Sequence, residues 1–380
     1  MAKIKFKTPD VRLMMRERLS YFSLCVKSLF FNAHLSQSYI ADILLEPIFK
    51  FVDSKVFTRY LGPFFVITVC GLTSAVVFIC YYVGLPYWMQ KSEITTYFLL
   101  IIGNWLLFNV VFHYFMAATT DPGVVNLSEA YNAVSICKKC LVPKPPRTHH
   151  CSICNRCILK FDHHCAFLNQ CIGFYNHRYF FLYMVYTVLG VIFIITFGIG
   201  IGYEVLWLSD GGAWEEKEQE KLEGALVRYN LTGHLIPVTE VHYEDLGITP
   251  KTHHNLPIGE LNDTLVYRLI SFVAVVVIAV IIALGSLTVW HYLLISRGET
   301  SVESHINKSE QKRYAAMGKT FKNPYDFGKY NNWKLFLGLK KGRSFIRHVV
   351  FPSAHKPEGD GFTWLTVDDD ENLRVNEHHL

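Results

Sequence analysis

Cysteine and histidine side chains are concentrated in one short stretch near the middle of the chain. Seven of the ten cysteines fall within 35 residues there, and four histidines lie between them. A disulfide framework would need an oxidising compartment and an even number of cysteines, whereas this number is odd. We therefore predict that the stretch binds metal and leaves one thiol over. The seven cysteines are Cys137, Cys140, Cys151, Cys154, Cys157, Cys165 and Cys171.

Four of these cysteines form two Cys-x2-Cys pairs, a spacing typical of zinc sites because two thiolates on one tight turn converge on the metal at about 2.3 Å. Two tetrahedral zinc ions need four ligands each, which six cysteines and two histidines supply. The spacing permits an interleaved arrangement, in which His149 or His163 could replace the histidine next to it. In that arrangement the first site contains Cys137, Cys140, His150 and Cys157, and the second contains Cys151, Cys154, His164 and Cys171.

The cysteine left over, Cys165, directly follows Asp162, His163 and His164. An imidazole that is not bound to metal could take the proton of the thiol, and the carboxylate could orient that imidazole. A nearby metal ion and a cationic histidine would also favour the thiolate, which is the nucleophilic form of cysteine. The plainer alternatives are an incidental thiol at Cys165 and a helix N-cap at Asp162. These residues are therefore the candidates for nucleophilic catalysis.

The apolar segments on either side must position this chemistry. Hydrophobic residues make up 51% of the chain, charged residues only 18%, and the mean hydropathy is +0.21, which excludes a disordered chain, a coiled coil and a small secreted disulfide scaffold. A helix needs about 20 apolar residues to cross a bilayer core. We predict an all-α polytopic membrane protein, with four transmembrane helices and a cytosolic zinc-binding cysteine-rich domain between helices two and three. The helices are expected at Phe64–Leu85, Tyr97–Phe115, Tyr179–Leu206 and Leu269–Leu294.

The Lys and Arg residues predict the orientation of the chain in the membrane. The stretch before the first span, the loop between spans two and three and the stretch after the fourth contain 10, 7 and 14 of them, whereas the segment from Glu204 to Asp263 contains 4 against 12 Asp and Glu. The positive-inside rule then places both termini and the cysteine-rich domain in the cytosol. The acidic loop becomes lumenal and carries glycosylation sequons at Asn230 and Asn262.

This layout divides the chain into seven regions. The apolar residues 19–53 are interrupted by charges, so we expect interfacial helices there rather than a fifth span. The regions are 1–63, cytosolic with interfacial helices; 64–116, transmembrane helices 1 and 2; 117–178, the cytosolic cysteine-rich domain; 179–206, transmembrane helix 3; 207–264, the lumenal loop; 265–294, transmembrane helix 4; and 295–380, the cytosolic C-terminal region.

The cysteine-rich stretch resembles the corresponding domain of the DHHC protein S-acyltransferases, whose signature appears here as Asp162-His163-His164-Cys165. The likeness covers most of the chain, including the four-span layout. Outside the domain it rests on Asp121-Pro122-Gly123 after span two, Thr300-Ser301-Val302-Glu303 after span four, and the aromatic-rich run from Asn323 to Trp333. The runs VSICKKC, RTHHCSICNRC, LISRGETS and FKNPYDFG further resemble the Abl-philin subgroup, that of the sixteenth mammalian member.

This resemblance implies a protein S-acyltransferase, mainly a palmitoyltransferase, that moves a long-chain acyl group from acyl-CoA to cysteine thiols of protein substrates. It implies that Cys165 carries the acyl group as a thioester, that His163 is its base, that Asp162 orients His163, and that the eight ligands hold two structural zinc ions. The expected partners are the lipid bilayer and membrane-associated proteins with accessible cytosolic cysteines, and no nucleic acid. The subgroup implies the endoplasmic reticulum membrane, with the Golgi as the alternative.

The chain departs from the family pattern next to the nucleophile. Ala166-Phe167 stand where Pro-Trp is usual, Gln170 replaces Asn, and Ser301 replaces the second Thr of its motif. Phe167 keeps an aromatic ring but loses the indole N–H, so contacts with acyl-CoA are affected more than the nucleophile is. A zinc-containing membrane scaffold or pseudoenzyme without transferase activity is therefore the alternative function. A nucleic-acid-binding finger is disfavoured, because the domain is only mildly basic and is tethered between membrane spans.

Acyl-CoA is amphipathic, so its fatty chain belongs between the spans and its head group in water beside the cysteine-rich domain. Basic residues of this domain are candidates for contact with the CoA phosphates, although each could equally be an ordinary solvated charge. They are Lys138, Lys139, Arg147, Arg156 and Lys160.

Overall fold

The computed structural model describes Phe22 and residues 55–125, 133–208, 263–339 and 342–369. Two compact units make up the chain, Met1–Leu61 and Gly62–Leu380, and the second contains nearly all of the described residues. The expected interfacial helices within 19–53, apart from Phe22, lie outside the described residues, as do most of the acidic loop and both of its sequons.

Four long helices confirm the predicted membrane spans, since each is apolar, long enough to cross a bilayer, and contains one of the expected segments. The apolar stretches are Leu61–Lys91, Glu93–Thr119, His177–Leu206 and Thr264–Ser296. The elements that form them are α3 (Lys55–Ile79), η1 (Cys80–Gly84), α4 (Leu85–Lys91), α5 (Glu93–Thr119), α6 (His177–Tyr203), η3 (Glu204–Leu208) and α8 (Asp263–Ser296).

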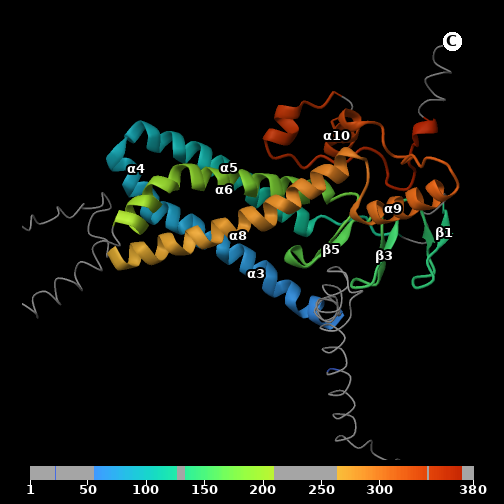
Figure 1. The fold of residues 1–380 in the computed structure, drawn as a ribbon, viewed down its shortest axis with the longest axis horizontal. Coiled ribbons are helices and arrows are strands. Elements are labelled where there is room, and N and C mark those ends of the chain that lie inside the picture. The colour runs from blue at the N-terminus through green and yellow to red at the C-terminus, as the bar shows by residue number, and fades with distance from the viewer. Residues whose placement is uncertain (1–21, 23–54, 126–132, 209–262, 340–341, 370–380) are drawn as a thin grey trace, which may run out of the picture. The chain divides into compact units, whose positions relative to one another are not determined.

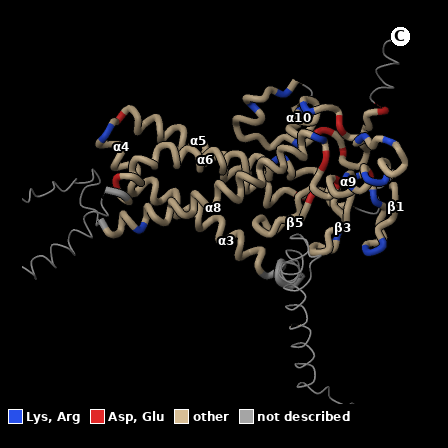
Figure 2. Tube along the Cα trace, in the orientation of Figure 1, with Lys and Arg blue, Asp and Glu red and all other residues tan. Residues whose placement is uncertain are grey.

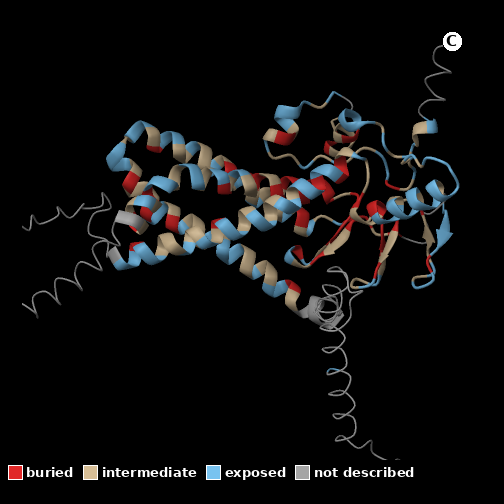
Figure 3. Cartoon of the chain, viewed as in Figure 1, coloured by how far each residue is buried: buried red, intermediate tan, exposed pale blue. Residues whose placement is uncertain are grey.

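The surface of these helices is that of a protein in lipid. Large apolar side chains are exposed along them, for example Ile67 (69%), Ile101 (70%) and Ile282 (67%). Charged residues gather at the two ends of the helices and are nearly absent between (Figure 2). α6 packs between α5 and α8 (Figure 1). Many of the buried residues lie where the helices meet the strands (Figure 3). The strands therefore pack against a well-buried end of the helices.

Three two-stranded antiparallel ladders form the domain between α5 and α6. Each strand has only two or three residues, and left-handed residues sit in the turns of the last two ladders, at Asn155 (φ 54°) and Asn169 (φ 49°). Strands this short bury almost no core of their own, so the ladders need other bonds to stay folded. The pairs are β1 (Ser135–Ile136) with β2 (Pro143–Lys144), β3 (His149–Cys151) with β4 (Arg156–Ile158), and β5 (His163–Cys165) with β6 (Gln170–Ile172).

The chain after α8 folds back onto this domain. α9 (Ser301–Ala316) begins with a capping box, in which the Thr300 hydroxyl accepts from the N–H of Glu303 and the Glu303 carboxylate accepts from the N–H of Thr300. α10 (Lys329–Leu337) follows, and a single π-helical turn, η6 (Ile346–Val350), comes after it. These elements bring the start of α9 against the domain and return the later chain toward the membrane helices.

The end of the described chain packs onto the cysteine-rich domain. Trp364 lies edge-on against Phe174, with ring centroids 5.4 Å apart. Gly361 has a φ of +79°, and a Cβ there would lie 2.8 Å from the Phe174 ring. Both the backbone angle and the lack of room therefore require glycine at this position.

A buried ion pair joins the domain to the chain after α8. Arg147 donates from Nε and Nη2 to the two carboxylate oxygens of Glu303, at 2.6 Å each, and from Nη2 to the Gly298 carbonyl at 2.8 Å. The guanidinium also lies 4.3 and 4.6 Å from the ring centroids of Tyr325 and Trp364. Burial opposes the charge on Glu303, but Arg147 outweighs burial and lowers the pKa of this carboxyl. Arg147, one of the candidates for contact with CoA phosphates, is therefore poorly suited to that role, because its side chain is 6% exposed and already paired with Glu303.

We predict that Arg147→Met destabilises the domain by about 3–5 kcal/mol, because it leaves the Glu303 carboxylate buried without a partner. Urea unfolding of the purified variant, followed by tryptophan fluorescence, measures this loss. The double variant Arg147→Met/Glu303→Gln is the control, and it should recover part of the stability because no charge is then left buried. If Arg147→Met unfolds at the same urea concentration as the unmodified chain, the pair does not hold the domain.

Candidate active site and metal centres

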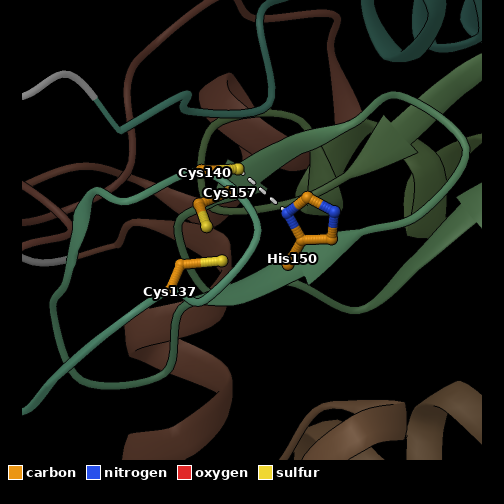
Figure 4. A group of neighbouring side chains, drawn as sticks. All are labelled: Cys137, Cys140, His150 and Cys157. Atoms are coloured by element: carbon orange, nitrogen blue, oxygen red, sulfur yellow. Dashed lines mark hydrogen bonds between the residues drawn. The ribbon is translucent and has the colours of Figure 1, made fainter.

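The first group of metal-ligand side chains lies where the first two ladders meet. It consists of Cys137, Cys140, His150 and Cys157, whose ligand atoms all lie within 4.8 Å of one another. The Cys140 Sγ atom is 3.0 Å from the His150 Nδ1 atom (Figure 4). His150 and Cys157 face each other across the β3–β4 ladder, which places one ligand on each strand. The first Cys-x2-Cys pair approaches them from the turn after β1.

The second group repeats this arrangement one ladder further along. It consists of Cys151, Cys154, His164 and Cys171, again with all ligand atoms within 4.8 Å. The His164 Nδ1 atom lies 3.3 Å from the Sγ of Cys154 and 3.5 Å from that of Cys171. His164 and Cys171 are register partners in the β5–β6 ladder. Hydrogen bonds from Cys154 and Cys171 to the sulfur of Cys151 lower the pKa of Cys151. This favours its thiolate form, which is the form that binds a metal.

These groups contain the same eight residues that the spacing singled out. His149 and His163, the alternatives to their neighbours, belong to neither group among the described residues. Three sulfur ligands and one imidazole nitrogen form a donor set that suits tetrahedral zinc, with distances of about 2.3 and 2.0 Å to the metal. Each group could therefore bind a metal ion, and each would tie together strands that have little core of their own.

The thiol left over, Cys165, belongs to neither group. It ends β5 and is 8% exposed. It belongs to one buried apolar cluster with Ala117 at the end of α5, Phe181 in the second turn of α6, and Ile295 at the end of α8. The sulfur therefore lies where the domain meets the ends of three membrane helices.

A buried carboxylate connects Cys165 to the start of α9. Asp162 is 1% exposed, and its Oδ2 accepts a hydrogen bond from His163 Nδ1 at 2.6 Å. Ser301 donates its backbone N–H to Oδ1 at 2.7 Å and its hydroxyl to Oδ2 at 3.0 Å. Asp162 is not the N-cap of the segment that follows it, because that segment is strand β5. Instead, Asp162 accepts a hydrogen bond from the backbone N–H of Ser301, the first residue of α9, which is far from it in sequence. Ser301 makes this contact although the family pattern has Thr at its position.

The charges in this group reinforce one another. Burial opposes the charge on Asp162, but His177 and His163 outweigh it and lower the pKa of this carboxyl. Burial also opposes the charge on His163, but its hydrogen bonds with Asp162 and Cys165 raise the pKa of this imidazole to about 10. The structure therefore favours a cationic His163 between a carboxylate and a thiol that can give up its proton. This is the arrangement expected of a cysteine nucleophile with an oriented base.

Two histidines near Asp162 were missed by reasoning from the sequence. His177, at the start of α6, has Nε2 4.0 Å from Asp162 Oδ1, and the His291 ring of α8 lies 5.9 Å from the His163 ring. Both are buried. The ligand atoms of both histidines lie close enough to Asp162 for the three residues to hold a cation. However, both oxygens of Asp162 already accept hydrogen bonds. A signal was available for His291, because an ionisable residue within an apolar span usually has a functional neighbour.

The residues that depart from the family pattern contact the membrane helices. The Phe167 carbonyl accepts from the Tyr114 hydroxyl of α5 at 2.9 Å, and the Phe167 ring lies 5.0 Å from that of Phe65 in α3. Gln170 reaches Arg156 through Oε1 and the Ala118 carbonyl through Nε2, at 3.5 Å each. The aromatic wall beside the thiol is therefore present, although Phe167 has no ring N–H to offer.

Comparison with known proteins agrees with this geometry. A family model described as DHHC palmitoyltransferase matches residues 130–308. The chain is 39% identical over 357 residues to palmitoyltransferase ZDHHC16B of Danio rerio, covering 93% of this chain and 89% of that protein. It is 39% identical over 350 residues to palmitoyltransferase ZDHHC16 of Homo sapiens, covering 92% and 86%. It is 27% identical over 244 residues to "Probable protein S-acyltransferase 16" of Arabidopsis thaliana, covering 60% and 68%.

The two groups predict different effects for neighbouring histidines. Cys137→Ala and His164→Ala should each lower the metal content from about two ions per chain to one or fewer, because each removes a ligand from one tetrahedral site and the two sites share the β3–β4 ladder. His163→Ala should keep both ions, since His163 bonds to Asp162. Mass spectrometry of the metals in purified variants measures this. Equal loss in His163→Ala and His164→Ala would mean that both histidines are ligands.

Proposed function

Because this chain belongs to the DHHC palmitoyltransferase family and is a protein S-palmitoyltransferase, we propose that Cys165 carries the palmitoyl group as a thioester. The observation that supports this most strongly is the 2.6 Å hydrogen bond from His163 to the buried Asp162 carboxylate, which orients this imidazole two residues before Cys165. Of the seven clustered cysteines, Cys165 alone belongs to neither metal group. Its sulfur is therefore available as a nucleophile.

The first half-reaction starts from the pair in which His163 holds the proton of Cys165, and the Cys165 thiolate attacks the carbonyl carbon of the acyl-CoA thioester. Asp162 stabilises this imidazolium. The bond between the carbonyl carbon and the CoA sulfur breaks, and the leaving thiolate takes the proton back from His163. The products are free CoA and an acyl group bound to Cys165 Sγ.

In the second half-reaction a cysteine of the protein substrate replaces CoA. His163 accepts the proton of the incoming thiol, which attacks the acyl carbon, and the Cys165 thiolate leaves. The same imidazole can assist both steps because one thioester is exchanged for another and no oxidant or water is consumed. Ping-pong kinetics follow from the covalent intermediate.

The fatty chain is proposed to lie among the membrane helices beside Cys165. The Tyr114 and Tyr183 rings of α5 and α6 lie 5.1 Å apart there, next to the wall formed by Phe65 and Phe167. Aromatic rings offer a large apolar surface to a chain of methylenes. A thioester at Cys165 would thus have lipid-like surroundings on one side and water on the other.

The CoA phosphates are proposed to meet the exposed Lys138 and Lys139 and the half-buried Arg156. Lys160 is less suited to this role. Its Nζ lies 5.5 Å from the ring centroid of Trp364, and burial together with Arg147 lowers the pKa of its ammonium to about 7. A lysine that is only partly charged binds phosphate weakly.

We assign the two metal groups to zinc ions with a structural role. Zinc bound by four protein ligands supplies folding free energy and has no open position for a substrate. The ligands on β3, β4, β5 and β6 would hold the two ladders together, and the second ladder ends at Cys165. The protein residues alone carry out the proton transfers.

The chain is a multi-pass membrane protein that acts on protein substrates. We propose that both termini and the cysteine-rich domain face the cytosol, with the regions divided as predicted from the sequence. The substrates would then be membrane-associated proteins with cytosolic cysteines close to the bilayer. The endoplasmic reticulum is the proposed location, on the basis of the subgroup that the sequence resembles.

Labelling with an alkyne analogue of palmitoyl-CoA tests the covalent intermediate. The purified chain should form an adduct that hydroxylamine removes, and Cys165→Ser should abolish it. His163→Ala should slow its formation by about 100-fold or more while keeping both metal ions. Cys80→Ser, which changes a thiol far from the domain, is the matched control and should label normally. An unmodified chain that holds its metal but forms no adduct would support the scaffold alternative.

The length of the acyl chain offers a further test. Gly190 lies eleven residues after Tyr179, about 17 Å along α6, which is comparable with the reach of a sixteen-carbon chain. No described atom would lie within 4 Å of a Cβ at Gly190, so helix packing does not require glycine there. Gly190→Tyr should shift the preference toward fourteen carbons or fewer without loss of activity.

Competition between acyl-CoAs of different length on the purified variants measures that preference. Gly202→Tyr is the matched control, because it also has open space around it but lies twelve residues further along α6. It should leave the profile unchanged. An unchanged profile in Gly190→Tyr, with activity intact, would place the end of the acyl chain elsewhere.

A further inference from the structure

The chain after α10 runs beside α6. The Tyr186 hydroxyl of α6 donates to the carbonyls of Val349 and Val350, at 2.7 and 3.1 Å. Leu337 and Val349 are buried in one apolar cluster with Leu182 and Tyr186. In Figure 1 this part of the chain, in dark orange and red, lies next to the ends of α5 and α6 nearest the strands. The C-terminal chain therefore covers part of a membrane helix.

The position of Tyr186 along α6 gives the depth of this contact in a bilayer. Tyr186 comes nine residues after His177, the first residue of α6, which is about 13 Å along the helix. The span to which α6 belongs has 30 residues, so it is about 45 Å long and projects by roughly 7 Å from each face of a core about 30 Å thick. With the span upright and centred in the core, Tyr186 lies roughly 6 Å inside the hydrocarbon, and the carbonyls that it binds lie in its outer part.

From this depth the chain returns along the first turns of α6. Arg178 donates from Nη2 to the carbonyls of Ser353 and His355, at 3.1 and 2.7 Å. The Tyr179 hydroxyl donates to the same His355 carbonyl at 3.4 Å. Residues 349–355 thus run antiparallel to the start of α6, and three of its side chains hold their carbonyls.

A backbone segment in lipid needs a protein hydrogen-bond donor for its carbonyls, and the side chains of α6 provide such donors here. Hydrocarbon offers no hydrogen-bond donor, so irregular backbone at membrane depth must be satisfied by protein. The π-helical turn of η6 pairs its own groups, and the side chains of α6 supply donors where the turn ends. In water these carbonyls could bind solvent, and buried tyrosine and arginine donors would not be needed for them.

The outer face of the same turn is apolar. Phe345, Ile346 and Phe351 are 53%, 63% and 52% exposed, an arrangement that is costly in water and favourable in lipid. Arg347 is also exposed, and an arginine stem can lie along acyl chains while its guanidinium reaches the phosphates. Apolar side chains with a nearby basic residue are typical of segments that lie in a membrane interface.

We propose that residues 342–351, the interfacial segment, dip into the membrane leaflet that surrounds the helix ends nearest the two metal groups. Phe345, Ile346 and Phe351 contact acyl chains of lipid, and Arg347 contacts head-group phosphates. The segment anchors the chain after α10 to the bilayer, in addition to the four spans. It amends the expectation that all of 295–380 lies in the cytosol. The proposal stands on the membrane helices and does not depend on the catalytic roles assigned to Asp162, His163 and Cys165.

Photo-crosslinking in a bilayer tests the proposal. The full-length chain is reconstituted into nanodiscs of phosphatidylcholine and phosphatidylserine with p-benzoylphenylalanine incorporated at Ile346, at Phe351 or, as the control, at Met317. Met317 is 54% exposed, similar to the test positions, but follows α9 beside the strands. Mass spectrometry after illumination counts lipid adducts. Metal content and size-exclusion profile show that each variant is folded.

The expected result is at least tenfold more lipid adduct at Ile346 and Phe351 than at Met317. Three results would overturn the proposal: no lipid adduct at the test positions, crosslinks from them to a second copy of the chain, or equal lipid adducts at all three positions. A variant that fails to fold is replaced by the same probe at Phe345, which belongs to the same exposed face.

Discussion

The Asp162 carboxylate is the constraint on which the rest of the site depends. A buried carboxylate is stable only if hydrogen bonds and positive charge compensate the water it has lost. Here the donors come from two distant parts of the chain: His163 in the cysteine-rich domain and Ser301 after the fourth span. The orientation of His163 therefore requires that the fourth helix has already been placed. Local sequence around Cys165 cannot create the site by itself.

The first turn of α9 connects this constraint to the stability of the domain. Ser301 binds Asp162, and two residues later Glu303 both closes the capping box and pairs with Arg147. One helical turn thus donates hydrogen bonds to a carboxylate of the proposed active site and supplies the partner of a buried guanidinium. The departure at Ser301 is tolerated because the contact with Asp162 uses its backbone N–H and its hydroxyl, both of which serine retains.

Much of this architecture follows from the sequence because its signals are local. Each span is a continuous apolar run, and the Cys-x2-Cys pairs fix which thiols can converge on one ion. Signals that depend on pairing across long distances were not readable: Arg147 looked like any basic residue of the domain, although its partner Glu303 lies 156 positions away. His291 is itself a signal, as an ionisable residue within an apolar span, but the sequence does not show that it lies near Asp162. The path of residues 342–355 along α6 has no motif and became visible only when burial and hydrogen-bond partners were known.

The interleaving of the two metal groups has a consequence for how the protein responds to metal supply. Cys151 of the second group falls within the sequence range of the first, and Cys157 of the first falls within the range of the second. The β3–β4 ladder supplies ligands to both, so emptying either group loosens the strands that the other needs. With metal bound as proposed, half-loaded molecules would be scarce. Scarcity of zinc in a cell would then reduce the number of molecules that hold both ions, while each of these molecules keeps its full activity. The total activity would therefore fall steeply over a narrow range of zinc concentration.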